Sequence, residues 1–119
     1  MHIRAMKLSR ILEIVEGTIV CGADRLNEEV SMAFASDLMS DVLTLPTVNV
    51  LLITGLSNIQ TIRTADMADI NYVLLARGKK ASPELIQLAS EHNMVVIETP
   101  YSMFRTCGIL YDAGLSAVY

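Results

Sequence analysis

The residues with the clearest potential for chemistry lie in two short stretches, and each stretch follows an apolar run. Gly55, Ser57 and Asn58 come directly after "VNVLLIT" and indicate a turn followed by the start of a helix. Backbone N–H groups at a helix start are unpaired and carry a positive partial charge, so they attract anions. A group of cations follows a second apolar run: Arg77, Lys79 and Lys80. Together these residues suit a small anionic ligand, such as a nucleotide.

The same two stretches also have a purely structural interpretation. Ser57 and Gln60 have the spacing of a capping box, in which each side chain satisfies a backbone donor of the other residue. Gly55 would then serve only to turn the chain, and "RGKK" would be a solvated loop. Neither stretch matches the phosphate-loop motif GxxxxGKS/T or the dinucleotide motif GxGxxG. The sequence leaves both interpretations open.

The sequence shows no arrangement that is typical of catalysis. Cys107 follows Arg105 closely, and a nearby cation lowers a thiol pKa and favours the reactive thiolate. Cysteine is also among the residues most often buried as small hydrophobes, and we favour that interpretation. No GxSxG motif occurs, and the predicted central strands do not end in the aspartate that a phospho-receiver needs. We therefore predict no catalytic residue and no enzyme activity, and keep a thiol enzyme as the third hypothesis.

A metal site or a bound cofactor is not expected either. The two cysteines, Cys21 and Cys107, are far apart in the sequence and form no CxxC pair. The histidines, His2 and His92, do not cluster with them. Because zinc sites need several such ligands at short spacing, we interpret both cysteines as reduced thiols.

Composition limits the classes of protein that this chain can belong to. Its 119 residues predict one domain over 1–119, and 52% apolar residues with 18% charged residues predict a globular fold. The formal charge of −4 argues against binding to nucleic acid or to anionic lipid. No apolar stretch approaches the roughly 20 residues of a membrane span, and no secretory signal is evident. We expect a cytoplasmic protein, and we interpret residues 1–5 as an extension before Met6.

The first part of the chain predicts a helix, two strands and a second helix. "KLSRILEIV" (7–15) has apolar residues at helical spacing, and "TIVCG" is a short strand that we place, with this helix, at one edge of the sheet. Residues 29–36 predict a strand with Val30, Met32 and Phe34 on one face. Ser36 and Asp37 are then expected to cap the next helix, "DLMSDVLTL".

The rest of the chain alternates buried strands with amphipathic helices. The strands are "VNVLLITG" (48–55), "INYVLLARG" (70–78) and "MVVIETP" (94–100), and their continuous apolar character predicts a parallel sheet covered on both faces. Ser82 is expected to cap the helix that starts at Pro83, and Thr99-Pro100 to open the last helix. The predicted fold is a three-layer α/β/α arrangement with a mainly parallel sheet of four to five strands.

This fold brings the candidate residues to one place. In open α/β sheets, ligands bind beyond the carboxyl ends of the strands. The predicted ligand contacts at that edge are Ser36, Gly55, Ser57, Asn58, Arg77, Lys79, Lys80 and Thr99.

The C-terminal segment is markedly apolar from Phe104 to Tyr119. A helix this apolar must be covered, and a small sheet does not cover all of it. We therefore expect a symmetric homodimer.

The order of these segments resembles the DRTGG domain family. The likeness runs from "MKLSRILEIVEGTIVCG" through "AFASDLMSDVL", "LLITG" and "VLLARGKK" to the C-terminal helix, and it is strongest to the short stand-alone members, which carry "TGLSNIQTIRTADM" and "SMFRTCGILYDAGL". At the place of the family's namesake stretch a glycine is kept, Gly55, but the Asp-Arg pair is not. The resemblance implies a fold similar to the N-terminal domain of HPr kinase/phosphorylase and a regulatory or dimerisation module without catalysis of its own.

Two hypotheses for the function lead. The first is a non-catalytic regulatory module that forms a homodimer and binds a nucleotide or another small anion at the carboxyl edge of the sheet. The alternative is a protein–protein interaction adaptor without a small-molecule ligand, in which the apolar C-terminal helix contacts the partner.

Overall fold

A computed structural model describes residues 5–45 and 49–119 of the chain. Predictions that concern residues 1–4 and 46–48 lie outside these described ranges. They include most of the proposed extension and the first residue of the strand 48–55. Within the described ranges, no helix is long and apolar enough to cross a membrane.

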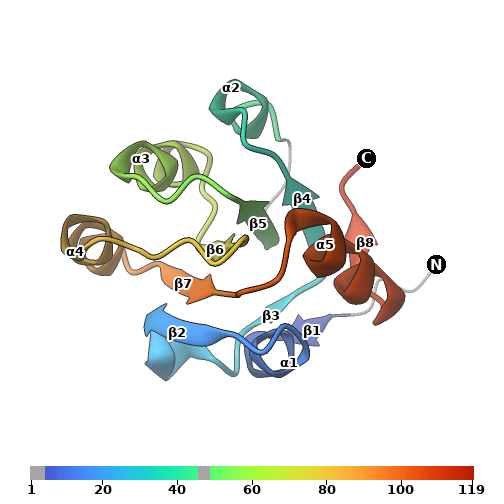
Figure 1. Cartoon of the computed structure of the whole chain (residues 1–119). Coiled ribbons are helices and arrows are strands. Elements are labelled where there is room, and N and C mark those ends of the chain that lie inside the picture. The colour runs from blue at the N-terminus through green and yellow to red at the C-terminus, as the bar shows by residue number, and fades with distance from the viewer. Residues whose placement is uncertain (1–4, 46–48) are drawn as a thin grey trace.

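The centre of the molecule is a six-stranded sheet with the order β2-β7-β6-β5-β4-β8. Neighbouring strands run parallel from β7 to β8, and only β2 is antiparallel. The mainly parallel α/β fold that the sequence predicts is therefore confirmed (Figure 1). The four longest parallel strands are β4 (Met32–Ala35), β5 (Val50–Thr54), β6 (Tyr72–Leu75) and β7 (Val95–Glu98).

The apolar runs form strands because both faces of the sheet are buried. Along β5, Leu51 and Ile53 point into one hydrophobic cluster and Leu52 into the other. Along β6, Leu74 points into the first of these clusters and Val73 into the second. Alternate side chains of a strand point to opposite faces, so an uninterrupted apolar run is what a doubly covered strand requires.

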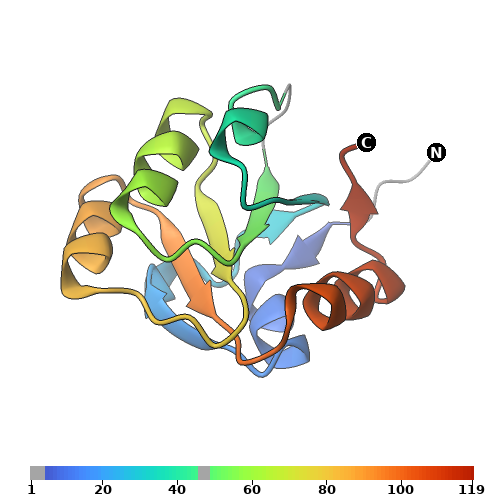
Figure 2. The same cartoon turned by 45° about the horizontal axis from the view of Figure 1, so that its top comes forward.

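Helices cover both faces and complete three layers. The helices α1 (Leu8–Ile14) and α5 (Met103–Asp112) pack on one face. The other face carries α2 (Met39–Val42), α3 (Ile59–Met67) and α4 (Pro83–Glu91). Figure 2 shows α1 in blue beside α5 in dark red, away from the other three helices.

Short strands form the two edges of the sheet. The strand β2 (Thr18–Cys21) lies antiparallel to β7, which confirms the prediction that "TIVCG" is an edge strand. The helix α1 does not share that edge, because it packs over one face of the sheet. The other edge is β8 (Ser116–Ala117), which pairs with β4 and raises the sheet from the expected four or five strands to six.

The expected strand 29–36 is divided in two, and this corrects the placing of its side chains. Its first part, β3 (Glu29–Val30), leaves the main sheet and pairs with β1 (Met6–Lys7). Val30 then packs in the cluster under α1, whereas Phe34 packs against the cluster on the other face. The change of sheet at Ser31 breaks the alternation that would have put both residues on one face. The connection to β3 contains one short 3-10 helix, η1 (Ala23–Arg25).

The predicted start of α4 is right, and the predicted starts of α2 and α5 are wrong. Ser82 caps α4 by accepting a hydrogen bond from the Leu85 N–H at 3.1 Å, as expected. The last helix starts at Met103 and is capped by Ser102, not opened by Thr99-Pro100. The helix expected over 37–45 shortens to α2, and its N-cap Leu38 makes no side-chain cap bond.

Ser36 and Asp37 do not cap α2 because both side chains have other partners. The Ser36 hydroxyl accepts a bond from the Leu38 N–H at 2.9 Å and so forms a local turn. The Asp37 carboxylate points away from α2, toward the end of β5.

Candidate functional site

The parallel strands bring the candidate residues to a common edge, which we call the rim. The rim consists of the segments that follow the ends of β4, β5, β6 and β7: Ser36–Asp37, Gly55–Asn58, Arg77–Lys80 and Thr99–Ser102. Ligands of parallel α/β proteins usually bind at this end of the sheet. The sequence therefore placed its candidate residues on the edge where they lie in the structure.

The centre of the rim is a three-way contact between Asp37, Gly55 and Arg77. The Gly55 N–H donates to Asp37 Oδ1 at 2.7 Å, and the Thr54 hydroxyl donates to the same oxygen at 3.0 Å. The Arg77 guanidinium lies 3.4 Å from Asp37 Oδ2 and donates to the Gly55 carbonyl at 3.2 Å. In the sequence, the Gly55 N–H and the Arg77 cation are candidate contacts for an external anion. In the structure both contact a carboxylate of the chain itself, that of Asp37.

This contact explains why position 55 is a glycine. A Cβ atom there would overlap the guanidinium of Arg77, which lies directly against the backbone. Gly55 is buried, and it does not have a positive φ. The residue is therefore needed for a close approach and not for an unusual backbone conformation.

The bonds to Asp37 also fix its charge. The Gly55 N–H, then the Thr54 hydroxyl and the Arg77 charge, hold the pKa of Asp37 below its ordinary value. Hydrogen bonds to the charged form and an adjacent cation both favour ionisation. Asp37 is therefore an anion at neutral pH.

Arg77 adopts a left-handed backbone conformation, which is uncommon for a residue with a side chain. Its φ is 66°, and Gly78 follows with a φ of 69°. The turn is held by the N–H of Arg77, which donates to the Tyr101 carbonyl at 2.7 Å, and by that of Gly78, which donates to the Thr99 carbonyl at 3.0 Å. These bonds join the loop after β6 to the loop after β7. Left-handed non-glycine residues are uncommon, and strained conformations concentrate at functional sites.

The two lysines of the rim differ in their surroundings. The Lys80 ammonium lies 3.5 Å from Glu98, whose side chain is only 8% exposed. Glu98 also accepts the Ala81 N–H at 2.6 Å, so it anchors the loop that carries the lysines. Lys79 is exposed, and within the described residues it has no carboxylate at ion-pair distance. The charge of Lys79 is therefore not paired within the chain segments described, which leaves it available to a ligand.

The start of α3 corrects the predicted capping box. Asn58, not Ser57, is the N-cap, and its side chain accepts a hydrogen bond from the Thr61 N–H at 3.2 Å. The Thr61 hydroxyl donates back to the Leu56 carbonyl at 2.8 Å. Gln60 instead lies near Thr64, at 3.5 Å. Ser57 is consequently free of the capping role and lies half-buried at the rim.

Thr99 is, together with Gly55, one of the two predicted contacts that are buried. Its side chain is 1% exposed, and its hydroxyl donates to the Val15 carbonyl at 2.7 Å, at the end of α1. The same hydroxyl accepts the Tyr101 N–H at 3.2 Å. Thr99 thus ties the rim to α1, and an outside molecule could reach its hydroxyl only if this loop opened.

Tyr101 and Arg105 close the rim on the side of α5. The Arg105 guanidinium lies 3.8 Å from the centre of the Tyr101 ring. The Tyr101 hydroxyl donates to Glu16 at 2.6 Å, and this hydrogen bond raises the pKa of the tyrosine. Arg105 is therefore stacked on an aromatic ring and is not directed at Cys107 in the way that the thiol hypothesis requires.

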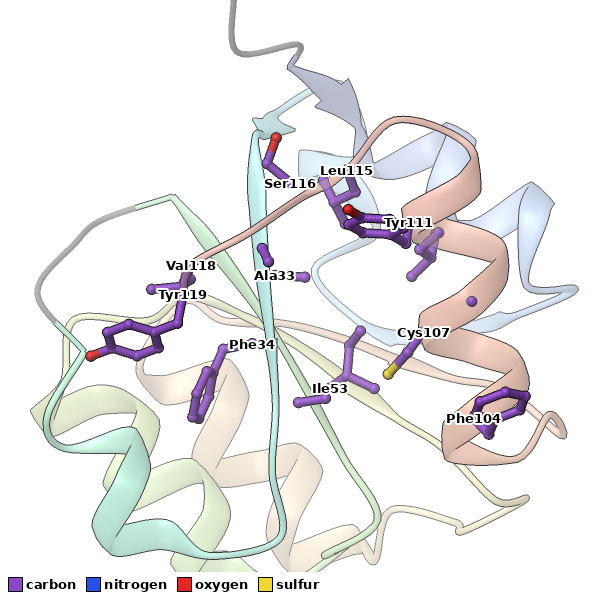
Figure 3. Close-up of a pocket in the computed structure, with 14 residues that line it drawn as sticks. Ala33, Phe34, Ile53, Phe104, Cys107, Tyr111, Leu115, Ser116, Val118 and Tyr119 are labelled. Atoms are coloured by element: carbon purple, nitrogen blue, oxygen red, sulfur yellow. The ribbon is translucent and has the colours of Figure 1, made fainter.

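A second feature, an apolar groove, lies between α5 and the β4–β8 edge of the sheet. It has a volume of about 470 Å³, and Figure 3 shows side chains of α5 on one side and of the sheet on the other. The strand β4 contributes Ala33, Phe34 and Ala35 to its lining. The groove is lined by Ala33, Phe34, Ile53, Phe104, Cys107, Tyr111, Leu115, Val118 and Tyr119, among others.

The groove leaves large apolar side chains in contact with solvent. Phe104 is 90% exposed, Tyr111 71% and Tyr119 78%. The Tyr119 ring meets Phe34 edge to face, with 6.2 Å between the ring centres. The Cys107 sulfur points from α5 toward Ile53, and burial raises the pKa of this thiol. Both cysteines are free thiols.

Asp37 is the rim residue that the sequence-based assignment missed. Its position after a strand was visible in the sequence, but there it was interpreted as a helix cap. Its bond to Gly55 joins residues 18 positions apart, and no local pattern encodes such a contact. Glu98 was missed for the same reason. Within the described residues, no group of three or more potential ligands could hold a metal ion.

Comparisons with known proteins agree with this fold. A model of the DRTGG domain matches residues 10–113. No curated protein matches the chain. Among solved structures, the chain is similar to the CBS and DRTGG domains of the regulatory region of a Clostridium perfringens pyrophosphatase, complexed with its activator diadenosine tetraphosphate. The TM-score is 0.73 at 16% identity, over 92% of this chain and 50% of that chain. The chain therefore spans about half of that structure and shares the fold of the matched half.

Proposed function

The chain belongs to the DRTGG domain family, as the sequence resemblance predicted, and we propose that it is a cytoplasmic, non-catalytic regulatory domain that forms a homodimer and binds a nucleotide or another small anion at the rim. The observation that carries this proposal is the contact of the exposed Arg77 with the Gly55 carbonyl, in the loop that leads into α3, with the exposed Lys79 two residues further along the same loop as Arg77. A helix start and adjacent cations together form a common environment for phosphate groups.

The similar regulatory region from Clostridium perfringens gives this proposal further support. That protein was crystallised with diadenosine tetraphosphate as its activator. A nucleotide with several phosphates needs several donors, and the rim offers hydroxyl, amide and cationic groups. The proposed contacts are the exposed Asn58, Arg77, Lys79 and Lys80, the half-buried Ser36 and Ser57, and the buried Gly55 and Thr99.

A thermal-shift screen followed by calorimetry tests the nucleotide proposal. ATP, ADP, diadenosine tetraphosphate and inorganic phosphate are titrated into the wild type, Lys79→Ala and Arg77→Ala. We expect a nucleotide to raise the melting temperature of the wild type, and each variant to weaken that effect. Arg10→Ala is the matched control, because Arg10 is exposed on α1, on the other side of the molecule from α3. If every compound leaves the melting temperature unchanged, the nucleotide proposal is wrong.

The apolar groove favours a second candidate function, that of a protein–protein interaction adaptor. Exposed aromatic side chains that surround an apolar groove are typical of protein interfaces. Phe104 and Tyr111 on α5 supply such a surface, and the expected homodimer would bury it. In this alternative the rim binds no small molecule, and the groove contacts the partner.

Light scattering coupled to size-exclusion chromatography tests the homodimer. We expect twice the 13.0 kDa mass of the chain for the wild type. Phe104→Glu should give the monomer mass, because it places a charge in the groove. Met67→Glu is the control, since Met67 is 71% exposed on α3 and lies outside the groove. A monomeric wild type, or equal effects of both variants, would contradict this use of the groove.

A further inference from the structure

We propose that Asp37 is an internal competitor for the anion position of the rim, so that a bound anion displaces it and releases the segment that leads into α2. This inference rests on the proposed function, because it concerns the same ligand and the same rim. It adds a conformational response to the binding of that ligand.

The geometry at Asp37 is that of a bound anion. Its Oδ1 receives the Gly55 N–H at 2.7 Å and the Thr54 hydroxyl at 3.0 Å. Its Oδ2 faces the Arg77 guanidinium at 3.4 Å. A backbone N–H, a hydroxyl and a guanidinium are the donors that proteins use for phosphate oxygens as well as for carboxylates. A phosphate would therefore find its donors already bonded to Asp37.

Charge and position together make Asp37 displaceable. A phosphate carries more negative charge than a carboxylate. Repulsion between the two anions therefore prevents both from bonding to the Arg77 guanidinium unless Asp37 moves. The Asp37 side chain is 40% exposed, so part of it already faces solvent. The deeper donors, Gly55 and Thr54, are buried and stay in place.

Displacement of Asp37 would reach α2 because few other contacts hold the intervening segment. The helix α2 has only four residues, and its N-cap Leu38 has no side-chain cap bond. The Ser36 N–H donates to the Ile53 carbonyl at 3.0 Å, and Val42 is buried. Between these two anchors, Met39 packs against the core, and Asp37 supplies the side-chain hydrogen bonds to Thr54 and Gly55 at the end of β5. Leu38 and Leu43 are exposed on this segment, so its movement would change an apolar surface.

The test compares anion binding by the wild type, Asp37→Ala and Asp41→Ala. ATP and inorganic phosphate are the probes, and calorimetry gives the dissociation constants. We expect Asp37→Ala to bind ATP about tenfold more tightly than the wild type, because it no longer contains the competitor. Asp41→Ala is the control: it removes the same charge from α2, but Asp41 makes no side-chain contact to the rim within the described residues. We expect the double variant Asp37→Ala/Arg77→Ala to lose this increase in affinity for ATP.

Asp37→Asn keeps the inference testable if Asp37→Ala unfolds. Its amide oxygen can still accept the Gly55 N–H, but it has no charge to offer Arg77, so we expect an intermediate affinity. Hydrogen exchange gives an independent readout. ATP should speed exchange in residues 36–45 of the wild type and leave the already fast exchange of Asp37→Ala unchanged.

The outcomes separate this inference from the proposed function. If the wild type binds ATP and Asp37→Ala binds it no more tightly than Asp41→Ala does, Asp37 is no competitor and the inference fails alone. If Asp37→Ala binds ATP and the wild type does not, the inference is supported and the wild-type rim is closed to this nucleotide. If neither protein binds any probe, the rim is not an anion site and both proposals fail.

Discussion

The carboxylate of Asp37 accepts the backbone N–H of Gly55 at 2.7 Å and so joins the end of β4 to the end of β5. Arg77, from the end of β6, lies against both residues. Three neighbouring strand ends are therefore connected by one carboxylate, one glycine and one guanidinium.

The close approach at Gly55 predicts that Gly55→Ala destabilises the protein only while Arg77 is present. The new methyl group must push the guanidinium aside, which breaks its bonds to Asp37 and to the Gly55 carbonyl. We expect a loss of about 1 kcal/mol in the free energy of unfolding, because the pair is partly exposed. Urea unfolding of the single and double variants measures this value. In an Arg77→Ala background Gly55→Ala should cost little, and an equal loss in both backgrounds would contradict the packing explanation.

The start of α3 predicts different effects for two adjacent substitutions. Asn58→Ala removes the N-cap acceptor of the Thr61 N–H and should cost about 1 kcal/mol of stability. Ser57→Ala removes no cap and should stay within about 0.5 kcal/mol of the wild type. Urea unfolding of the two variants decides between them. A larger loss of stability for Ser57→Ala than for Asn58→Ala would instead support the capping box that the sequence suggested.

Glu28 predicts a loss of stability in acid. Its carboxylate pairs with Arg25 at 2.8 Å and accepts the Tyr72 hydroxyl at 2.6 Å, and these bonds lower the pKa of Glu28 from 4.5 to about 2. A carboxyl with a lowered folded-state pKa stabilises the fold above its unfolded pKa. That stabilisation is therefore complete above pH 4.5 and is lost as the pH falls toward 2.

Urea unfolding of Glu28→Gln checks this pH dependence. At about pH 6 we expect Glu28→Gln to be about 1 kcal/mol less stable than the wild type, a modest value because the pair is partly exposed. At about pH 2 most of this difference should be lost, because Glu28 is then nearly fully protonated in the unfolded chain and about half protonated in the folded protein. Glu29→Gln is the control, since Glu29 is exposed and adjacent. A difference that persists unchanged in acid would rule out the ion pair as its cause.

The buried hydroxyl of Thr99 predicts a structural cost for its removal. Thr99→Val deletes the donor to the Val15 carbonyl and the acceptor of the Tyr101 N–H, and so leaves buried polar groups unpaired. We expect a loss of about 1–2 kcal/mol in the free energy of unfolding. Thr18→Val, at an exposed position of β2, is the matched control and should have little effect. If Thr99→Val were as stable as the control, the bond to α1 would contribute nothing.

Cys107 predicts slow alkylation. Burial raises the pKa of its thiol, so the thiolate fraction at neutral pH is smaller than that of an ordinary cysteine. The test uses a Cys21→Ser variant, in which Cys107 is the one remaining thiol. We expect iodoacetamide to react with Cys107 more slowly than it reacts with the thiol of free glutathione. Mass spectrometry over time gives the rate. Labelling faster than glutathione would revive the hypothesis of a thiol enzyme.

The sequence predicted the parts of this fold that depend on local patterns. Continuous apolar runs identified β5, β6 and β7, and Ser82 with Pro83 identified the start of α4. Features that depend on distant contacts were missed. The division at Ser31 follows from the pairing of β3 with β1, and α2 starts after Asp37 because Asp37 bonds to the end of β5. No window of neighbouring residues contains that information.

The same division applies to the site. The residues of the rim could be placed together because parallel strands end at one edge. Whether their donors are free could not be predicted, since Asp37 and Glu98 reach them from other strands. For this reason the exposed Lys79 is a more accessible candidate contact than the central Gly55, which is buried and already bonded to Asp37.

The two outer strands of the sheet have a consequence for the behaviour of the protein at high concentration. The register of β2 shifts between Ile19 and Cys21, and β8 contains only two residues. Neither side therefore offers a long, regular row of free backbone donors and acceptors on which another chain could grow. Ordered fibrils built by strand addition should start slowly from the native state, even though the strands inside are among the most apolar in the sequence.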